Sequence, residues 1–311
     1  MTNSKILISG LINLEVTLQV DSFPLEYCPV RYPFFGVNSS ISGVGFNIAK
    51  ALTHLGNSCN FLSIVGNDPA GEIAKRELIK NRISTEFIAE VLPKTPHSVI
   101  LYDKSGKRQI NVDLKEVQET KFPEELFSIA NKEISLAVLC NINFSRTFLE
   151  RMKVRGIPIA TDVHAISDIH DSYNRDFMRY ADILFMSDEL LPVPPVEWIR
   201  AVQMEFGTPI IVIGCGSKGA IMGEKGSGLI RKLPAVFTRP VSNTIGAGDA
   251  LFSCFIHFFI QTRDPWESLR KAMIFASWKI GETGAAHGFL STSALETKLP
   301  EFSNKLIFED V

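Results

Sequence analysis

Short apolar runs alternate with longer amphipathic segments along most of this chain. Each run has the length of a buried β-strand, and the segments between the runs repeat their apolar residues at helical spacing. Strands are expected at residues 5–10, 59–65, 136–140, 157–162, 183–186 and 210–213, and helices at 44–55, 70–81, 144–155, 196–206, 246–261 and 266–282. Strands that alternate with helices predict an α/β fold around a mainly parallel central sheet.

Two segments depart from this alternation. One begins with residues 16–20 and continues irregularly to Phe35, and the other, 98–113, has two alternating runs separated by Asp103-Lys104-Ser105-Gly106. The second segment is typical of a β-hairpin. Both are too polar for central strands, so we expect a small projecting β-sheet that acts as a lid, formed by segments at about 14–38 and 95–115. Without an internal repeat or linker, residues 1–311 are predicted to form a single domain.

The composition excludes several classes of partner. The chain has 32 Lys and Arg residues against 34 Asp and Glu residues, a net charge of −2, so nucleic acid and membrane surfaces are not expected to bind. Its five cysteines are scattered without metal-binding spacing, which is typical of a reducing compartment. The N-terminus lacks the apolar core of a signal peptide, and the longest apolar run, 251–260, is too short to span a membrane. These observations predict a cytoplasmic protein.

A glycine-containing segment near the C-terminus has the pattern of an anion-binding site. The residues Gly246-Ala247-Gly248-Asp249 open a very apolar helix. Glycines in a first helical turn expose backbone N–H groups to a ligand, and the helix dipole adds positive potential there. The carboxylate of Asp249 has two interpretations: it caps the helix, or it acts as a general base in phosphoryl transfer to a hydroxyl group.

A second glycine cluster, 42–49, opens the first long helix. It lies about thirty residues after the first strand and has no third glycine in register, so it does not fit the dinucleotide-binding fingerprint. Gly43 and Gly45 bring the backbone close to a small polar ligand, with Asn47 as donor and acceptor, or they allow close helix packing. The sequence leaves both interpretations open.

Acidic residues elsewhere give weaker signals. Asp162 lies at the predicted carboxyl end of a core strand, where ligand sites of α/β folds gather, and it is a candidate for holding magnesium or phosphate. His164 and His170 accompany Asp162, Asp168 and Asp171, but polar loops of this kind mostly consist of caps and turns. No metal ligands are therefore assigned.

Four features follow one another along the chain. Residues 42–49 read S-G-V-G-F-N-I-A, residues 65–71 read V-G-N-D-P-A-G, Arg108 lies in the expected hairpin, and residues 243–249 read N-T-I-G-A-G-D. In this order they resemble the motifs of the ribokinase or PfkB-type carbohydrate kinase family, and the resemblance covers nearly the whole chain. It implies a ribokinase-like three-layer α/β/α fold with a mainly parallel central sheet and a small projecting β-sheet lid.

The resemblance also implies an activity, the ATP-dependent transfer of a γ-phosphate to a primary hydroxyl group of a sugar, or of a nucleoside as the alternative. Asp249 would be the catalytic base, and the amides of Gly246, Ala247 and Gly248 would form the anion hole. The implied substrate-binding residues are Asn13, Glu15, Gly43, Gly45, Asn47 and Arg108, and the implied nucleotide-binding residues are Gly216, Lys218, Gly219 and Thr244. Members of the family commonly need Mg²⁺, and several respond to K⁺.

The chain departs from the family pattern in several places. The magnesium motif N-x-x-E becomes Ser187 to Leu190, Gly214 replaces a threonine of the nucleotide loop, and Asn243 and Glu15 each stand where the family has Asp. These differences support a second hypothesis, a catalytically weak protein that binds a sugar or nucleotide as a regulator. The intact segment 246–249 favours the enzyme, because a regulator has no need for a base in an anion hole.

The predicted lid also favours self-association. The alternating runs of 98–113 give both faces of a small sheet some apolar side chains. Pairing of two lids would bury these side chains, so we expect a homodimer formed through the lid.

Overall fold

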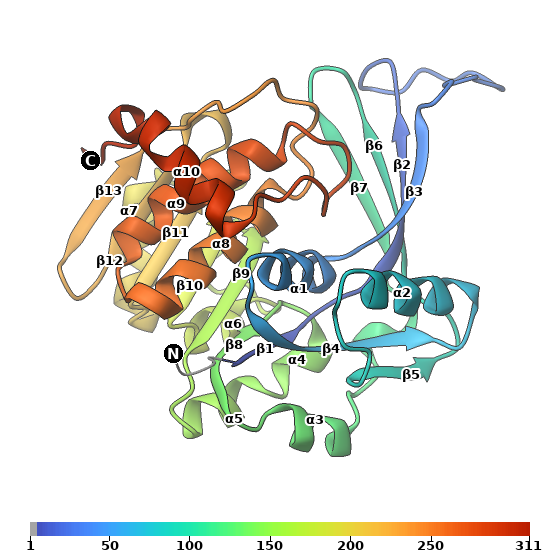
Figure 1. Ribbon diagram of the computed structural model, residues 1–311, viewed down its shortest axis with the longest axis horizontal. Helices are drawn as coiled ribbons and strands as arrows, with labels where there is room; N and C mark the ends of the chain where they lie inside the picture. The colour runs from blue at the N-terminus through green and yellow to red at the C-terminus, as the bar shows by residue number, and fades with distance from the viewer. Residues whose placement is uncertain (1–4) are drawn as a thin grey trace.

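The computed structural model describes residues 5–311, which form two β-sheets and the helices around them (Figure 1). The larger sheet has ten strands in the order β14-β13-β12-β11-β10-β9-β8-β1-β4-β5. Its strands are β1 (Lys5–Ser9), β4 (Ser58–Gly66), β5 (Ile88–Leu92), β8 (Ile134–Leu139), β9 (Ile159–Ala165), β10 (Ile183–Ser187), β11 (Ile210–Gly214), β12 (Ala220–Glu224), β13 (Leu229–Leu233) and β14 (Glu309–Asp310). Neighbouring strands from β5 to β11 are parallel, and β12, β13 and β14 extend the sheet in antiparallel pairs.

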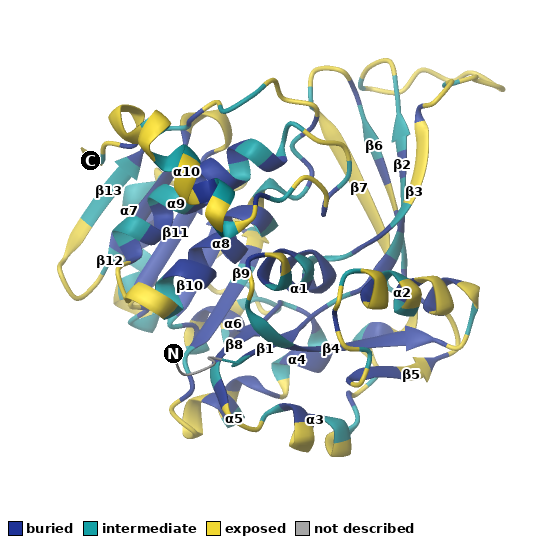
Figure 2. Ribbon diagram, in the orientation of Figure 1, coloured by how far each residue is buried: buried dark blue, intermediate teal, exposed yellow. Residues whose placement is uncertain are grey.

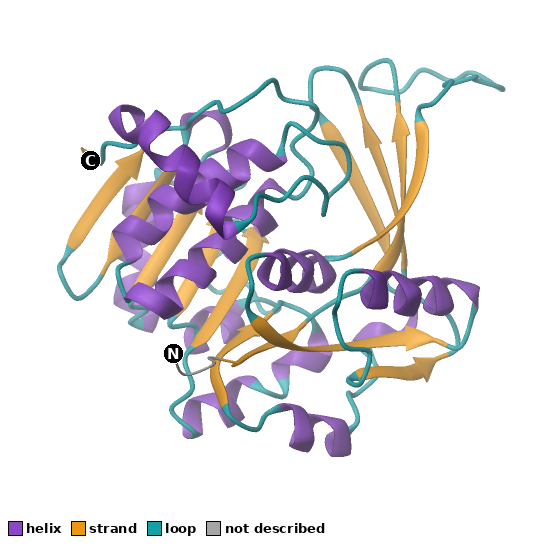
Figure 3. Ribbon diagram, in the orientation of Figure 1, coloured by secondary structure: helices purple, strands orange, loops and turns teal. Residues whose placement is uncertain are grey.

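Helices cover both faces of this sheet (Figure 3). One face carries α1 (Val44–His54), α2 (Pro69–Lys80), α8 (Ala247–Thr262), α9 (Pro265–Lys279) and α10 (Thr292–Phe302). The other carries α3 (Glu124–Ala130), α4 (Asn143–Arg146), α5 (Leu149–Val154), α6 (Arg175–Tyr180) and α7 (Pro195–Phe206). Short 3₁₀ turns lie at Lys115–Gln118, Gly216–Lys218 and Ser303–Lys305. The predicted three-layer α/β/α arrangement is thus present.

The central strands are apolar on both sides because both sides are covered. In β1, Ile6 and Ile8 belong to the core beneath α1 and α8, whereas Leu7 belongs to the core on the opposite face. Figure 2 shows these strands as the most buried part of the molecule. This is why each appears in the sequence as a continuous apolar run.

Two helix predictions need correction. The helix expected at 144–155 is broken into α4 and α5, because Phe148 turns into the core and stacks on Phe127 with ring centroids 4.0 Å apart. The helix expected to end at residue 282 ends at Lys279, because the amides of Ser242 and Asn243 bind the carbonyl of Ile280. The second difference places the end of α9 directly against the segment 242–249.

The smaller sheet forms the expected lid and rises beside α1 and α2 (Figure 1). Its order is β3-β2-β6-β7, from β3 (Val37–Ser42), β2 (Asn13–Gln19), β6 (His97–Tyr102) and β7 (Arg108–Asp113). The hairpin β6–β7 was predicted, whereas β3 was not, because its polar residues give no strand signal. Side chains directly opposite in a ladder share one face, so Glu15, Ser98 and Val112 point to the same side of the lid.

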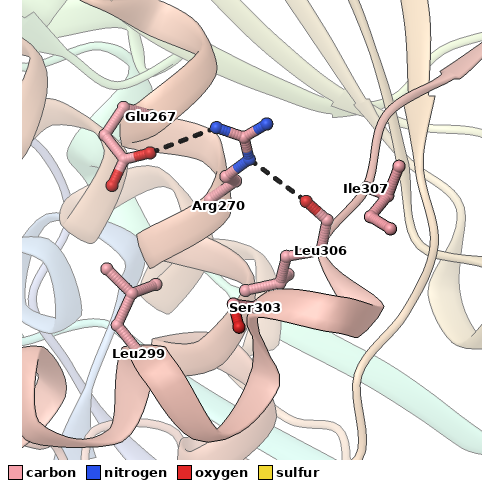
Figure 4. A pocket seen from close by; sticks show the side chains of 6 residues that line it. All are labelled: Glu267, Arg270, Leu299, Ser303, Leu306 and Ile307. Atoms are coloured by element: carbon pink, nitrogen blue, oxygen red, sulfur yellow. Dashed lines mark hydrogen bonds and ion pairs between the residues drawn. The ribbon is translucent and has the colours of Figure 1, made fainter.

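The C-terminal segment is attached beside α9 (Figure 4). Arg270 donates from Nε to the carbonyl of Leu306 at 3.1 Å, and its guanidinium lies 5.0 Å from the ring centroid of Phe308. A cavity here is lined by Glu267, Arg270, Leu299, Ser303, Leu306 and Ile307. None of these is a residue that the sequence analysis singled out. Arg270 attaches the C-terminal segment to α9. No helix within residues 5–311 is both long and apolar enough to cross a membrane.

The backbone of α1 approaches β1 so closely that a side chain does not fit between them. A Cβ atom at Gly45 would lie 2.5 Å from the carbonyl carbon of Gly10. We predict that Gly45→Ala lowers the free energy of unfolding by about 1–3 kcal/mol, because backbone atoms cannot move aside as a flexible side chain can. Urea denaturation measures the change.

Gly226→Ala is the matched control, since its added Cβ would have no atom within 4 Å. Its stability should stay within about 0.5 kcal/mol of the unsubstituted protein. Equal stability of the two variants would show that α1 does not depend on this contact.

Candidate active site

The predicted site residues gather at one edge of the main sheet. The strands β1, β8, β9, β10 and β11 are parallel neighbours, so their carboxyl ends meet at that edge. The first turn of α8 lies there, and the lid faces it through Arg108, which bonds to Thr244. Segments far apart in the sequence therefore supply one site.

The first turn of α8 offers unpaired backbone donors. Gly246 has a φ of 76°, and a Cβ at this position would lie 2.2 Å from the carbonyl oxygen of Ala285. The amide of Ala247 donates to the Thr244 carbonyl at 3.2 Å. Within residues 5–311 the amides of Gly246, Gly248 and Asp249 have no hydrogen-bond partner. The available donors thus differ from the expected set by the loss of Ala247 and the gain of Asp249.

The carboxylate of Asp249 does not cap its helix. It accepts a hydrogen bond of 2.7 Å from Nδ2 of Asn47 on α1, and the hydroxyl of Ser42 lies 3.4 Å from Oδ1 of Asn47. Loss of hydration raises the pKa of Asp249, as does the negative charge of Asp162, whereas the bond from Asn47 lowers it. A carboxylate held this way is a better proton acceptor than an exposed one. Asn47, expected at the substrate, is thus engaged with the carboxylate.

The lid places polar side chains on the face that covers the site. Asn13, Glu15 and Thr17 alternate along β2, and all three are buried. Nδ2 of Asn13 donates to the hydroxyl of Ser98 at 2.7 Å, while Oδ1 of Asn13 and Oε1 of Glu15 are buried without a partner. Burial raises the pKa of Glu15, and the nearby charge of Asp249 adds to this effect. Buried acceptors without donors are expensive, so this face is built for a ligand that supplies hydroxyl or N–H groups.

Arg108 connects the lid hairpin to two loops of the main sheet. Its guanidinium donates to the hydroxyl of Thr244 at 2.7 Å and lies 3.8 Å from a carboxylate oxygen of Glu189. Arg108 was expected at the substrate and Thr244 at the nucleotide. In this structure the two side chains bind each other and connect the lid to the loop before α8.

Of the two glycines in the cluster 42–49, one serves close helix packing and the other lies beside the lid residue Asn13. Gly45 packs against Gly10, so its role is close helix packing. Gly43 has a φ of 105°, and a Cβ there would lie 2.9 Å from Oδ1 of Asn13. Gly43 therefore borders the unpaired oxygen of Asn13 on the ligand side.

The predicted nucleotide loop follows β11. Gly216 and Lys218 are exposed on a 3₁₀ turn, where they are open to a ligand. Gly219 is buried, and its added Cβ would lie 2.0 Å from the carbonyl oxygen of Leu233. Gly219 therefore allows β12 to pass this backbone and does not face a ligand.

The carboxylates near the anion site do not form a metal-binding cluster. No group of three or more His, Cys, Asp or Glu side chains with metal-binding geometry exists in the part of the chain that the structure describes. Asp162 on β9 is largely buried, and its Oδ2 would lie 3.9 Å from a Cβ at Gly248. A magnesium ion held mainly by phosphate and water needs only one or two protein carboxylates, and Asp162 fits that requirement.

The sequence analysis missed Lys279. This lysine, the last residue of α9, has an exposed fraction of 0% and donates from Nζ to the carbonyl of Ile245. Burial lowers its pKa from 10.5 to about 8. Ala272 and Phe275 precede it at helical spacing on the buried stripe, and this position of a lysine was the available signal.

Comparison with known proteins identifies the family of this chain. A family model described as pfkB family carbohydrate kinase matches residues 3–292. The deoxyribokinase of Salmonella typhi is 25% identical over 299 residues, which cover 92% of this chain and 95% of the relative. The match to the family model includes the lid segments and the segment 243–249.

Solved structures share the fold. A microbiome-derived acarbose kinase superposes with a TM-score of 0.85 at 20% identity, over 96% of this chain and 100% of that one. The Burkholderia thailandensis nucleoside kinase in complex with inosine superposes with a TM-score of 0.77 at 17% identity, over 97% and 98%. These likenesses confirm the predicted α/β architecture with its small separate sheet.

The bond between Asn47 and Asp249 leads to a prediction about ionisation. Removal of the amide in Asn47→Ala should raise the pKa of Asp249 further, because the bond favours the charged carboxylate. Titration of the carboxyl carbon of Asp249 by NMR, assigned through its loss in Asp249→Asn, measures the pKa.

Asn81→Ala is the control, since Asn81 bonds only within the end of α2. Its Asp249 signal should titrate as in the unsubstituted protein. An unchanged or lowered pKa in Asn47→Ala would mean that Asn47 does not stabilise the ionised carboxylate.

Proposed function

Because the chain belongs to the pfkB family of carbohydrate kinases, we propose that it transfers the γ-phosphate of ATP to a primary hydroxyl group of a sugar held between its lid and Asp249. The chain is a phosphotransferase that acts on an alcohol group, as its named relatives are. The proposal concerns the residues that perform the transfer and the class of acceptor.

One observation supports a polyhydroxylated acceptor above all. Oδ1 of Asn13 and Oε1 of Glu15 are buried acceptors without donors, on the lid face that covers Asp249. Sugar hydroxyl groups are donors of the size and number that would satisfy both oxygens. Bound in this way, a sugar would direct a further hydroxyl group toward Asp249.

The proposed reaction uses Asp249 as the base. The acceptor hydroxyl gives its proton to the carboxylate, and its oxygen forms a bond to the γ-phosphorus while the bond from that phosphorus to the β,γ-bridging oxygen breaks. The electron pair of the broken bond leaves with ADP. The amides of Gly246, Gly248 and Asp249 would stabilise the negative charge on the transferring phosphoryl group.

Magnesium would accompany the nucleotide, as kinases of this family generally require. Asp162 is the carboxylate best placed to hold it, beside the first turn of α8. The ion supplies positive charge to the β- and γ-phosphates when it is bound. Glu189 is less suitable, since it already faces Arg108.

A nucleoside is the second candidate acceptor. Register places Ile110 and Val112 on the same lid face as Ile100 and Ser98. The side chain of Ile110 is 51% exposed and that of Val112 is 48% exposed. An apolar edge of this kind would suit the flat face of a base, and a solved nucleoside kinase of this fold binds inosine. The polar residues of β2 still favour a sugar.

The cytoplasm is the proposed compartment. All five cysteines are free, which fits a reducing environment. Cytoplasmic ATP would supply the phosphate donor.

The test of the kinase is ADP release from Mg-ATP with a panel of hexoses, pentoses and nucleosides, in the presence and absence of K⁺. One acceptor class should raise the rate above background. Asp249→Asn should lower that rate roughly 10²- to 10⁴-fold, because it removes the base. Asp168→Asn, which changes an exposed aspartate, should keep the full rate.

Two other outcomes decide against this proposal. If no acceptor raises the rate while ATP or a sugar still raises the melting temperature, the binding-only regulator is correct. If Asp249→Asn retains the acceptor-dependent rate, another group is the base.

We also propose that the protein is a homodimer that pairs through the outer face of its lid. Val16, Leu18, Val99 and Leu101 lie on that face by their register, opposite to Glu15 and Ser98, and Val99 is 42% exposed. Apolar side chains on an open sheet face favour burial against a second copy.

Light scattering at micromolar concentration should therefore give twice the mass of 34.6 kDa. Val99→Asp should give the monomeric mass, because it places a charge in the interface. Val154→Asp, at an exposed position on α5, should remain dimeric. A monomeric mass for the unsubstituted protein would disprove the dimer.

A further inference from the structure

Lys279 carries a positive charge in the interior, directly behind the anion site. Its side chain is fully buried, and its ammonium group donates to the carbonyl of Ile245. A buried ammonium group costs several kcal/mol unless nearby groups compensate for it. A buried ammonium group beside an anion site therefore calls for a functional explanation.

The contact with Ile245 controls the direction of a donor in the anion hole. In a planar trans peptide the carbonyl oxygen and the amide hydrogen point in opposite directions. The ammonium group that holds the Ile245 carbonyl therefore also fixes the N–H group of Gly246, which points away from Lys279. This amide has no partner within residues 5–311, so it is free for a ligand.

Other contacts hold the same loop from different sides. The side chain of Ile245 packs against Ile100 of the lid and against Ala285. The amide of Ile245 donates to Oδ1 of Asn243 at 3.1 Å. Lys279 supplies the only charged contact of Ile245 in the described chain, and it is the contact that acts on the carbonyl.

The charges around Lys279 show what its ammonium group offsets. Asp249 and Glu15 are close enough to stabilise its charge, and Arg108 of the lid opposes it. When a nucleotide phosphate arrives, the site gains further negative charge beside these two carboxylates. A fixed positive charge then favours phosphate binding without an added monovalent cation.

We propose that Lys279 is a positioning residue for phosphoryl transfer, whose ammonium group orients the Ile245–Gly246 peptide and replaces a monovalent cation behind the anion hole. This inference rests on the proposed kinase function. It predicts that the enzyme works equally well in K⁺, Na⁺ and choline salts, because the fixed ammonium group already supplies positive charge behind the anion hole.

The titration of Lys279 gives a further signature. Burial lowers its pKa to about 8, so the ammonium group is charged at neutral pH and loses its proton as the pH rises through that value. Burial raises the pKa of the Asp249 carboxyl, and protonation of this base would lower kcat as the pH falls. We expect kcat to fall above about pH 8 through Lys279.

The experiment compares two methionine variants on the same helix. Lys279→Met keeps the volume and removes the charge, and it should lower kcat on the order of tenfold or more while the KM for the acceptor stays unchanged, an effect smaller than the 10²- to 10³-fold loss of a direct donor. Its basic limb should disappear from the pH profile. Lys271→Met, which breaks the ion pair with Glu296, should keep both kcat and the limb.

Chemical rescue distinguishes positioning from mere packing. Lys279→Ala leaves a space for a small cation, so ammonium chloride or KCl should restore kcat several-fold, while choline chloride should not. Lys279→Met should show no rescue, because its side chain fills the space. An equal response of folded Lys279→Ala to all three salts would overturn the proposal.

Two measurements on the unsubstituted enzyme hold even if the variants do not fold. A requirement for K⁺ or the absence of a basic limb would each disprove the role of Lys279. If no acceptor supports turnover, the kinase proposal fails separately. Calorimetry with a non-hydrolysable ATP analogue then tests Lys279: Lys279→Met should bind the analogue more weakly and ADP equally well, and equal binding of both would overturn the inference.

Discussion

The close approach of α1 to β1 is the constraint on which the site depends. Each of Gly10 and Gly45 occupies the space where the other would carry a Cβ atom. This contact places the start of α1 at the carboxyl end of β1, and Asn47 in the first turn can then reach Asp249 on α8. A larger residue at either glycine would move α1 outward and separate the two side chains. The packing of α1 and the bond between Asn47 and Asp249 therefore both depend on Gly10 and Gly45.

Much of the fold could be predicted because buried parallel strands are continuous apolar runs. β1 and β11 follow this rule, and α7 begins within one residue of its expected start. The strands β3, β5, β12, β13 and β14 were not predicted. β3, β13 and β14 are partly polar and largely unburied, so their side chains follow no clear period, whereas β5 and β12 are only five residues long.

The candidate site was predictable only where local backbone geometry leaves a trace. Gly246, Gly248 and Asp249 stand in one helical turn, and their spacing indicated an anion site before any fold was known. Lys279 leaves only the weak signal of its place on the buried stripe of α9, because a single lysine near the end of a helix is usually exposed. Its burial arises from the loop 242–245, the segment near Ala285 and the lid, which meet only in the folded chain.

The distance along the chain between the site's halves has a consequence for biosynthesis. Asn47 and Asp249 are 202 residues apart, and β1 pairs with both β4 and β8 before the last helices exist. A chain still on the ribosome can therefore form the central strands, but it lacks α8 and α9. Contacts of such long range are the slow step of folding. The nascent protein therefore lacks Asp249 and the anion site until nearly all of it has been synthesised, and it can act on ATP only after α8 and α9 have formed.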